Sequence, residues 1–133
     1  ADTGETSVAV AGDRPVGVDI EPVELRDTET WKGLLGDDGY LAALELQRET
    51  GESFDVTATR LWTLIEAERK AGTAAGGLPR LNGVLESGWV VFRSPSQSAC
   101  CVLSAALQDQ GREFVLSLAG ERFSLSGESG VDE

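Results

Sequence analysis

Four short β-rich runs follow one another in the second half of the chain, and this succession limits the possible folds more than any other feature. The runs are Leu81–Leu85, Trp89–Arg93, Ala99–Leu107 and Glu113–Leu118. Short polar segments containing glycine or proline lie between them. Because β-rich runs joined by short turns pair with their neighbours, the sequence predicts an antiparallel meander.

The chain begins with another β pattern. Ser7–Ala11 and Val16–Ile20 are separated by Gly12-Asp13-Arg14-Pro15, a run of turn formers, which predicts a β-hairpin. The second strand is expected to end near Pro22, because proline has no amide hydrogen to donate to a sheet.

Two short helices are expected next. From Asp27, apolar residues at the spacing i, i+3, i+4 predict a helix that breaks over Gly36-Asp37-Asp38-Gly39. A second helix should run from Tyr40 to Thr50 and close at Gly51, which suits a left-handed cap.

The longest predicted helix is Val56–Ala71, with Asp55 as its N-cap and Gly72 after its last turn. The expected fold class is therefore α+β, an antiparallel β-sheet packed against a long helix plus shorter helices. We assign residues 1–126 to one domain and 127–133 to a flexible tail.

The composition is that of a globular protein, with 133 residues of which 41% are hydrophobic and 26% are charged. No apolar run approaches the ~18 residues that a membrane-spanning helix needs, so we expect a soluble, cytoplasmic domain. The adjacent Cys100 and Cys101 are interpreted as reduced thiols packed as small apolar groups. The absence of Met indicates a piece of a longer protein.

Charge and missing residue types narrow the function. A formal net charge of −12 argues against partners such as nucleic acid and anionic membranes. The chain has no His, which excludes His-based zinc sites and Ser-His-Asp triads. Catalysis would have to use carboxylates, Lys, Arg or a hard metal ion.

Two carboxylates share one face of the predicted strand Val16–Ile20 and its continuation. Side chains alternate along a strand, so Asp19 and Glu21 stand beside Gly17, while the apolar face is expected to pack against the helices. A cation relieves the repulsion between two such acids, so the pair suits Mg²⁺. A solvated strand face is the alternative interpretation of the same two acids.

The long helix carries a second group of polar residues. Trp62, Glu66 and Lys70 are spaced i, i+4, i+8 and form one stripe, while Leu61 and Leu64 lie on a different side that can enter the core. Taken alone, this stripe is also compatible with an ordinary surface Glu–Lys pair.

Together the two segments resemble the paired signature of phosphopantetheinyl transferases, G-x-D-x-E followed by W-x-x-K-E-A-x-x-K. The matching residues are Gly17, Asp19, Glu21, Trp62, Glu66, Ala67 and Lys70. The resemblance covers roughly Ser7 to Leu107 and is closest to the carboxy-terminal half of the surfactin-type enzymes. The ETWKGLL segment is also similar to the transferase domain integrated into enediyne-type polyketide synthases of antibiotic biosynthesis.

The resemblance implies a function and a set of roles. Asp19, Glu21 and Glu66 would bind Mg²⁺, and Lys70 would contact a phosphate of coenzyme A. A serine of an acyl carrier protein or carrier domain would attack the β-phosphate, with Glu66 or a metal-bound water as proton acceptor. The domain would thereby transfer the phosphopantetheine arm of coenzyme A.

The sequence also departs from this family. Ile65 replaces the usual Lys, and the chain lacks the histidine-bearing half of the larger enzymes. We therefore expect a homo-oligomer, with a trimer preferred, or dependence on upstream sequence. Two rival interpretations remain, namely a weak or inactive carrier-binding scaffold of the same fold, and another magnesium-dependent phosphoryl enzyme.

Overall fold

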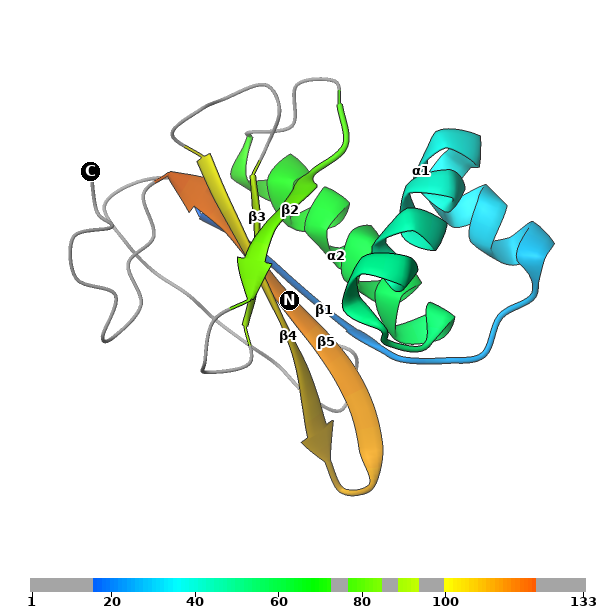
Figure 1. The fold of residues 1–133 in the computed structure, drawn as a ribbon. Helices are drawn as coiled ribbons and strands as arrows, with labels where there is room; N and C mark the ends of the chain where they lie inside the picture. The colour runs from blue at the N-terminus through cyan, green and yellow to red at the C-terminus, as the bar shows by residue number, and fades with distance from the viewer. Residues whose placement is uncertain (1–15, 73–76, 85–88, 94–99, 122–133) are drawn as a thin grey trace.

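The β-rich runs of the second half form consecutive strands in the computed structural model, which describes residues 16–72, 77–84, 89–93 and 100–121. The strands are β2 (Arg80–Val84), β3 (Val90–Arg93), β4 (Cys100–Asp109) and β5 (Arg112–Glu121). Each pairs antiparallel with the next, so the predicted meander is confirmed. An additional strand, β1 (Val16–Pro22), joins β5 and completes a sheet of order β1-β5-β4-β3-β2 (Figure 1).

β1 pairs with β5 along its whole length, from Val16 opposite Gly120 to Pro22 opposite Phe114. The strand ends at Pro22, as expected from the missing amide hydrogen. The predicted partner strand Ser7–Ala11 and the tail 127–133 lie outside the described residues, as do the thiols of the two cysteines in β4.

The two predicted short helices are the two arms of one kinked segment, α1 (Thr28–Thr50). Asp27 caps its start by accepting a hydrogen bond from the Thr30 amide at 2.8 Å. Gly36 has φ 79° and ψ 168°, which no helix accommodates, so the break predicted over four residues occurs at this glycine alone. Gly51 closes α1 at φ 76°, the left-handed cap that was predicted.

The long helix is α2 (Phe54–Ala71), and Gly72 ends it at φ 77° as predicted. The prediction of Asp55 as N-cap was wrong. Ser53 is the cap, because its hydroxyl accepts a hydrogen bond from the Val56 amide at 3.3 Å. Asp55 lies in the first turn instead, where its carboxylate accepts a hydrogen bond from the indole of Trp31 at 3.1 Å. The shift extends the helix by two residues and links it to α1.

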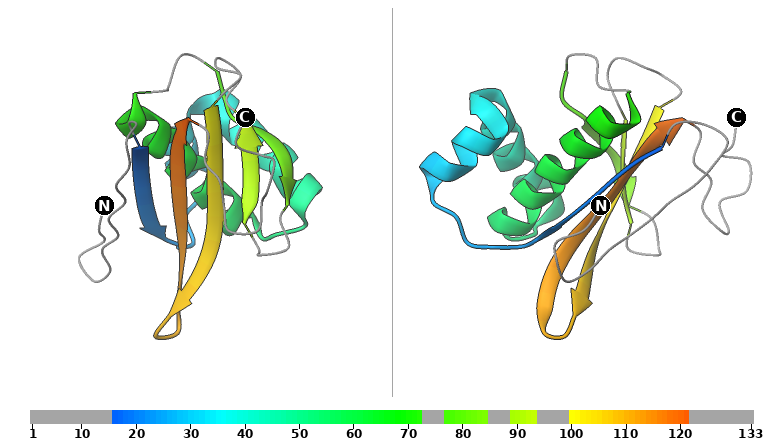
Figure 2. Two further views of the ribbon diagram at one scale, coloured as in Figure 1. Left: turned by 90° about the vertical axis from the view of Figure 1, so that its left-hand side faces the viewer. Right: turned by 180° about the vertical axis from the view of Figure 1, so that it is seen from behind.

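Both helices cover the same face of the sheet, which confirms the α+β class (Figure 2). α2 packs on the sheet, and α1 packs on α2. One apolar cluster joins α2 to the sheet through Leu64, Ala67, Phe92 and Ala119. A second joins the two helices around Trp31, which is 1% exposed. None of the described helices is long and apolar enough to cross a membrane.

The face of β1 that meets α2 is the opposite of the one predicted. Gly17 and Asp19 face the helix, so Val18 and Ile20, which alternate with them along the strand, face away from it. The reason is the close approach at Gly17, where a Cβ would lie 1.9 Å from the carbonyl oxygen of Ala67. The missing side chain lets the helix backbone rest on the strand. The polar face of β1, which carries Gly17 and Asp19, is therefore partly buried against α2.

Candidate functional site

The crossing of β1 and α2 brings together residues from both halves of the sequence signature. Beyond Gly17, the ammonium of Lys70 in the last turn of α2 lies 3.0 Å from Oδ1 of Asp19. The same ammonium donates to the carbonyl oxygen of Val18 at 3.2 Å. Lys70 is thus fixed against the strand, although 46% of its side chain is exposed.

Asp19 is buried, with 5% of the residue exposed, although the apolar face of this strand was the one expected to pack against the helices. Its second oxygen, Oδ2, is buried without a hydrogen-bond partner. Burial raises the pKa of Asp19, the hydrogen bond and charge of Lys70 oppose that rise, and the nearby Glu66 adds to it. A buried carboxylate with one satisfied oxygen keeps a free position for a further cation or proton.

Glu21 is half-buried at the end of the same face. Its pKa is raised first by burial and then by the charge of Asp19 and, more weakly, of Glu66, while Arg26 and Lys70 lower it. All three predicted metal ligands therefore lie close enough to act on one another electrostatically. All three belong to the two elements that cross here, Asp19 and Glu21 to β1 and Glu66 to α2.

Glu66 forms an ion pair with a residue of its own helix. Its carboxylate pairs with Arg69 at 2.6 Å, with Arg69 65% exposed and Glu66 29% exposed. An exposed pair of this kind is worth at most about 1 kcal/mol, so little energy holds Glu66 in this orientation. A rotation of the Glu66 side chain would free the carboxylate for another partner.

Within the described part of the chain, no three acidic or cysteine side chains are close enough together to hold a metal ion as they stand. The group nevertheless fits the chemistry of Mg²⁺, which prefers carboxylate oxygens. The unpartnered Oδ2 of Asp19 is the specific feature that fits, because a buried, unsatisfied acceptor is stabilised by a cation. Glu21 and Glu66 would supply the remaining protein oxygens.

Ile65 occupies the position where the family signature has Lys. It is half-buried and packs with Trp62 against the cluster between α1 and α2. An apolar residue is physically appropriate there, since a lysine would have to carry its charge past that cluster. Ile65 thus adds an apolar contact between the two helices and places no positive charge at this position.

Arg26 is a residue that the sequence analysis missed. Its guanidinium lies over the rings of Trp31 and Trp62, at 5.4 and 5.3 Å from their centroids, and forms an ion pair with Glu24 at 2.9 Å. Because Arg26 lowers the pKa of Glu21, it belongs to the surroundings of the site. The signal in the sequence was weak, since no spacing rule links an arginine after a strand to a tryptophan on a later helix.

A buried polar chain lies between α2 and the sheet next to the site. The guanidinium of Arg60 forms two hydrogen bonds with Glu52, at 2.8 and 2.7 Å, and a third with the hydroxyl of Ser104 at 3.1 Å. Ser104, Ser117 and Thr63 continue the chain through hydroxyl contacts of 3.1 and 2.7 Å. Ser117 lies opposite Asp19 in the pairing of β5 with β1. The network therefore fixes the residue next to Asp19 in the sheet.

Two arginines of the sheet lie away from this site. Arg80 and Arg93 are register partners on β2 and β3, at the opposite edge of the sheet from β1. Arg14 lies outside the described residues. Among the described cations, Lys70, Arg69 and Arg26 are those that contact the acids or act on them.

Comparisons with known proteins leave the chain without an assigned relative. No family model, curated protein or solved structure matches it. The function of the domain is therefore inferred from the site itself and from the resemblance of the two sequence segments.

Proposed function

We propose that this domain transfers the phosphopantetheine arm of coenzyme A to a serine of an acyl carrier protein or carrier domain, in a reaction that requires Mg²⁺. The observation that carries the proposal is the contact of 3.0 Å between Lys70 on α2 and the buried Asp19 on β1, with Glu21 two residues further along the strand and Glu66 one turn earlier on the helix. These are the residues that match the transferase signature, and they come from segments far apart in the sequence.

The metal would be held by Asp19, Glu21 and Glu66. When bound, Mg²⁺ supplies charge neutralisation for the diphosphate of coenzyme A, which is the main requirement of phosphoryl transfer. Asp19 is suited to the role because its Oδ2 is buried and unpartnered. Binding a cation there would lower the raised pKa of Asp19 and Glu21 and keep both ionised.

Lys70 would hold a phosphate oxygen. The ammonium of Lys70 is already positioned by two hydrogen bonds, to Asp19 and to the Val18 carbonyl. Its third N–H is the donor that would bind the diphosphate. In the transfer, the serine oxygen forms a bond to the β-phosphorus and the bond to the leaving 3′,5′-ADP breaks. Glu66 is the proposed acceptor of the serine proton, since its carboxylate is held by a largely exposed pair with Arg69 that little energy would break.

The test is to incubate the purified domain with apo carrier protein, coenzyme A and Mg²⁺, and to measure the mass of the carrier. A gain equal to one phosphopantetheine is expected. Glu66→Gln and Lys70→Met should abolish the gain, while Glu45→Gln, which removes an exposed acid paired with Arg48 elsewhere on α1, should leave it unchanged. Equal transfer by all variants would contradict the assignment of these residues.

A second candidate is a carrier-binding scaffold of the same fold with weak or no activity. Two observations favour it, namely the apolar Ile65 and the pairing of Asp19 and Glu66 with cations of the chain itself. In this case the carrier would bind and its mass would not change, with or without Mg²⁺.

The assembly state is part of the proposal. A domain of this size, resembling one half of the larger enzymes, would complete its site either by forming a homo-oligomer, with a trimer preferred, or by using upstream sequence of the same protein. A cytoplasmic polyketide synthase is the proposed setting. Light scattering gives the solution mass directly, and a monomer would favour the dependence on upstream sequence.

A further inference from the structure

A cleft of about 980 Å³ lies between α1 and the edge of the sheet, away from the site at β1. One wall is the second arm of α1, from Leu35 to Glu49, and the other is formed by residues 77–79, β2 and Phe92 of β3. Neither the three acids nor Lys70 line it. The cleft is large enough for several side chains, since ligand pockets commonly enclose ~300–1,000 Å³.

The floor of this cleft is apolar. Leu35, Leu46, Leu61 and Phe92 line it, and each is at most 8% exposed because the core lies beneath. Above them, Leu78 and Leu81 are only half-buried and contribute to the opposite wall. An incoming apolar side chain would therefore find a surface from which it can displace water.

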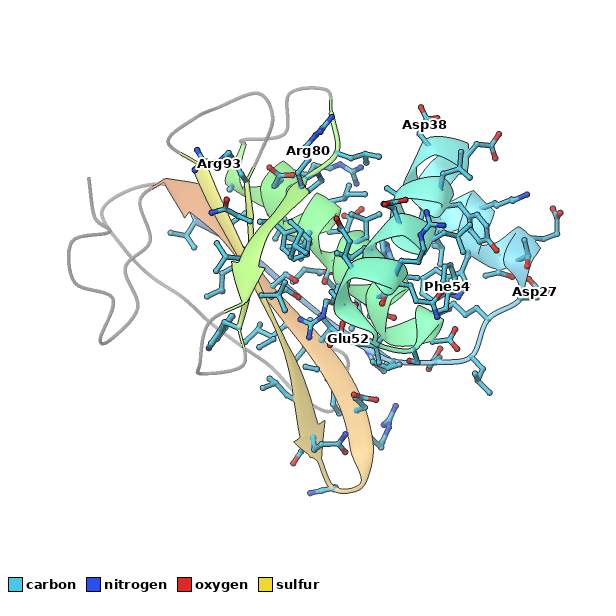
Figure 3. All side chains as sticks on the ribbon, viewed as in Figure 1. Asp27, Asp38, Glu52, Phe54, Arg80 and Arg93 are labelled. Carbon is cyan, nitrogen blue, oxygen red and sulfur yellow. The ribbon has the colours of Figure 1, made fainter. Side chains whose placement is uncertain are left out.

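The rim of the cleft is strongly acidic. Asp37, Asp38, Glu45 and Glu49 line the α1 side, and all four are exposed. Arg48 on the same helix pairs with Glu45, and Arg80 lines the cleft from β2. Figure 3 shows Asp38 on α1 and Arg80 on β2 at the same end of the domain. The excess of carboxylates selects for a positively charged occupant.

The neighbouring backbone favours an extended occupant. β2 is an edge strand of the sheet. Among the described strands it pairs with β3 alone, so its other edge has no strand partner there. An edge strand offers amide and carbonyl groups to which an extended peptide can add. Side chains alternate along such a peptide, so one set can enter the cleft while the other stays outside.

We propose that this cleft binds an extended, basic peptide segment of a partner protein, with Leu or Phe side chains on the apolar floor and Lys or Arg side chains at the acidic rim. This inference goes beyond the transferase function and does not depend on it. Coenzyme A and acidic carrier proteins are unsuitable occupants, because their negative charge would meet the carboxylates of α1.

The test uses a fluorescein-labelled heptapeptide of alternating Lys and Leu, with binding followed by fluorescence anisotropy. The matched probes are a Glu–Leu heptapeptide and heptalysine. We expect saturable binding of the Lys–Leu peptide, weaker binding of heptalysine and none of the Glu–Leu peptide. In amide NMR spectra the shifts should concentrate on residues 77–81 and on the second arm of α1.

Variants distinguish this cleft from the general negative charge of the domain. Asp38→Asn with Glu49→Gln removes two rim charges and should weaken binding about two- to thirtyfold, since exposed ion pairs contribute ~0.2–1 kcal/mol each. Asp109→Asn with Glu29→Gln changes the net charge equally at sites outside the cleft and should leave the affinity unchanged.

Circular dichroism establishes that both double variants fold. Equal weakening by the two double variants, equal binding of heptalysine and the Lys–Leu peptide, or shifts confined to other surfaces would each overturn the proposal. Self-association of the domain that competes with the peptide would also overturn it, because the occupant would then be a second copy.

Discussion

Gly17→Ala tests whether β1 and α2 meet as closely as the site requires. The added Cβ would lie 1.9 Å from the Ala67 carbonyl oxygen and 2.7 Å from the Ala71 amide nitrogen. Both contacts are backbone, so neither can be relieved by a side-chain rotation. Because non-bonded carbon contacts lie near ~3.5 Å, strand and helix would have to separate by more than about 1 Å.

The expected cost of that separation is about 3 kcal/mol, the upper end of the ~1–3 kcal/mol typical for overpacking a core. For a chain of 133 residues this lowers Tm by about 10 °C. The shift would also lengthen the contact of 3.0 Å between Lys70 and Asp19, so transfer activity should fall as well. Differential scanning calorimetry and the carrier mass assay measure the two effects.

Gly33→Ala is the matched control, because it makes the same chemical change inside α1, where the new Cβ would have nothing within 4 Å. It should stabilise the domain by about 0.5–1 kcal/mol, since alanine favours a helix more than glycine does. If Gly17→Ala left Tm within 1–2 °C of the unchanged protein, the close packing of β1 on α2 and the geometry of the site would be refuted.

Three further predictions follow from the same residues. Burial raises the native pKa of Asp19 and Glu21 above 3.8 and 4.5, so the folded state binds their protons more strongly than the unfolded state does. The stability measured by urea unfolding should therefore rise as the pH falls from 7 through the native pKa values, and level off below the unfolded pKa values. In the double variant Asp19→Asn with Glu21→Gln, this gain in stability should disappear. Lys70→Met leaves the buried Asp19 without its cation and should destabilise the domain at pH 7 by about 1–2 kcal/mol. Arg69→Met removes one partner of an exposed pair and should cost less than about 1 kcal/mol. Equal losses of stability in urea unfolding would argue against the buried contact. Ser53→Ala should cost about 1 kcal/mol in thermal unfolding by removing the N-cap of α2, and an unchanged Tm would return that role to another residue.

The strands and the helix ends could be predicted from local sequence patterns. The meander, the stop at Pro22 and the glycine caps at Gly51 and Gly72 follow from turn chemistry and from the backbone freedom of glycine, and all are present. The N-cap of α2 was placed two residues late, since both Ser53 and Asp55 are good caps and only the hydrogen bond of Asp55 to Trp31 decides between them.

The orientation of β1 could not be predicted from its own residues. Alternation placed Val16, Val18 and Ile20 on one face, and burial of that face against the helices was the simpler expectation. The outcome was decided by Gly17, whose missing side chain admits α2 on the polar face. Contacts between segments far apart in the sequence, such as Lys70 with Asp19 or Arg26 with Trp62, are likewise set by packing and not by local spacing.

In the proposed transferase site, Asp19, Glu21 and Glu66 share one divalent cation. Titration with Mn²⁺, followed by the electron paramagnetic resonance signal of the free ion, tests it without requiring coenzyme A or a carrier. We expect the domain to bind Mn²⁺ saturably and Mg²⁺ to displace it. Asp19→Asn and Glu66→Gln should lose the binding, while Glu45→Gln should keep it. An undiminished free-ion signal with the folded domain, or equal binding by all three variants, would contradict the claim.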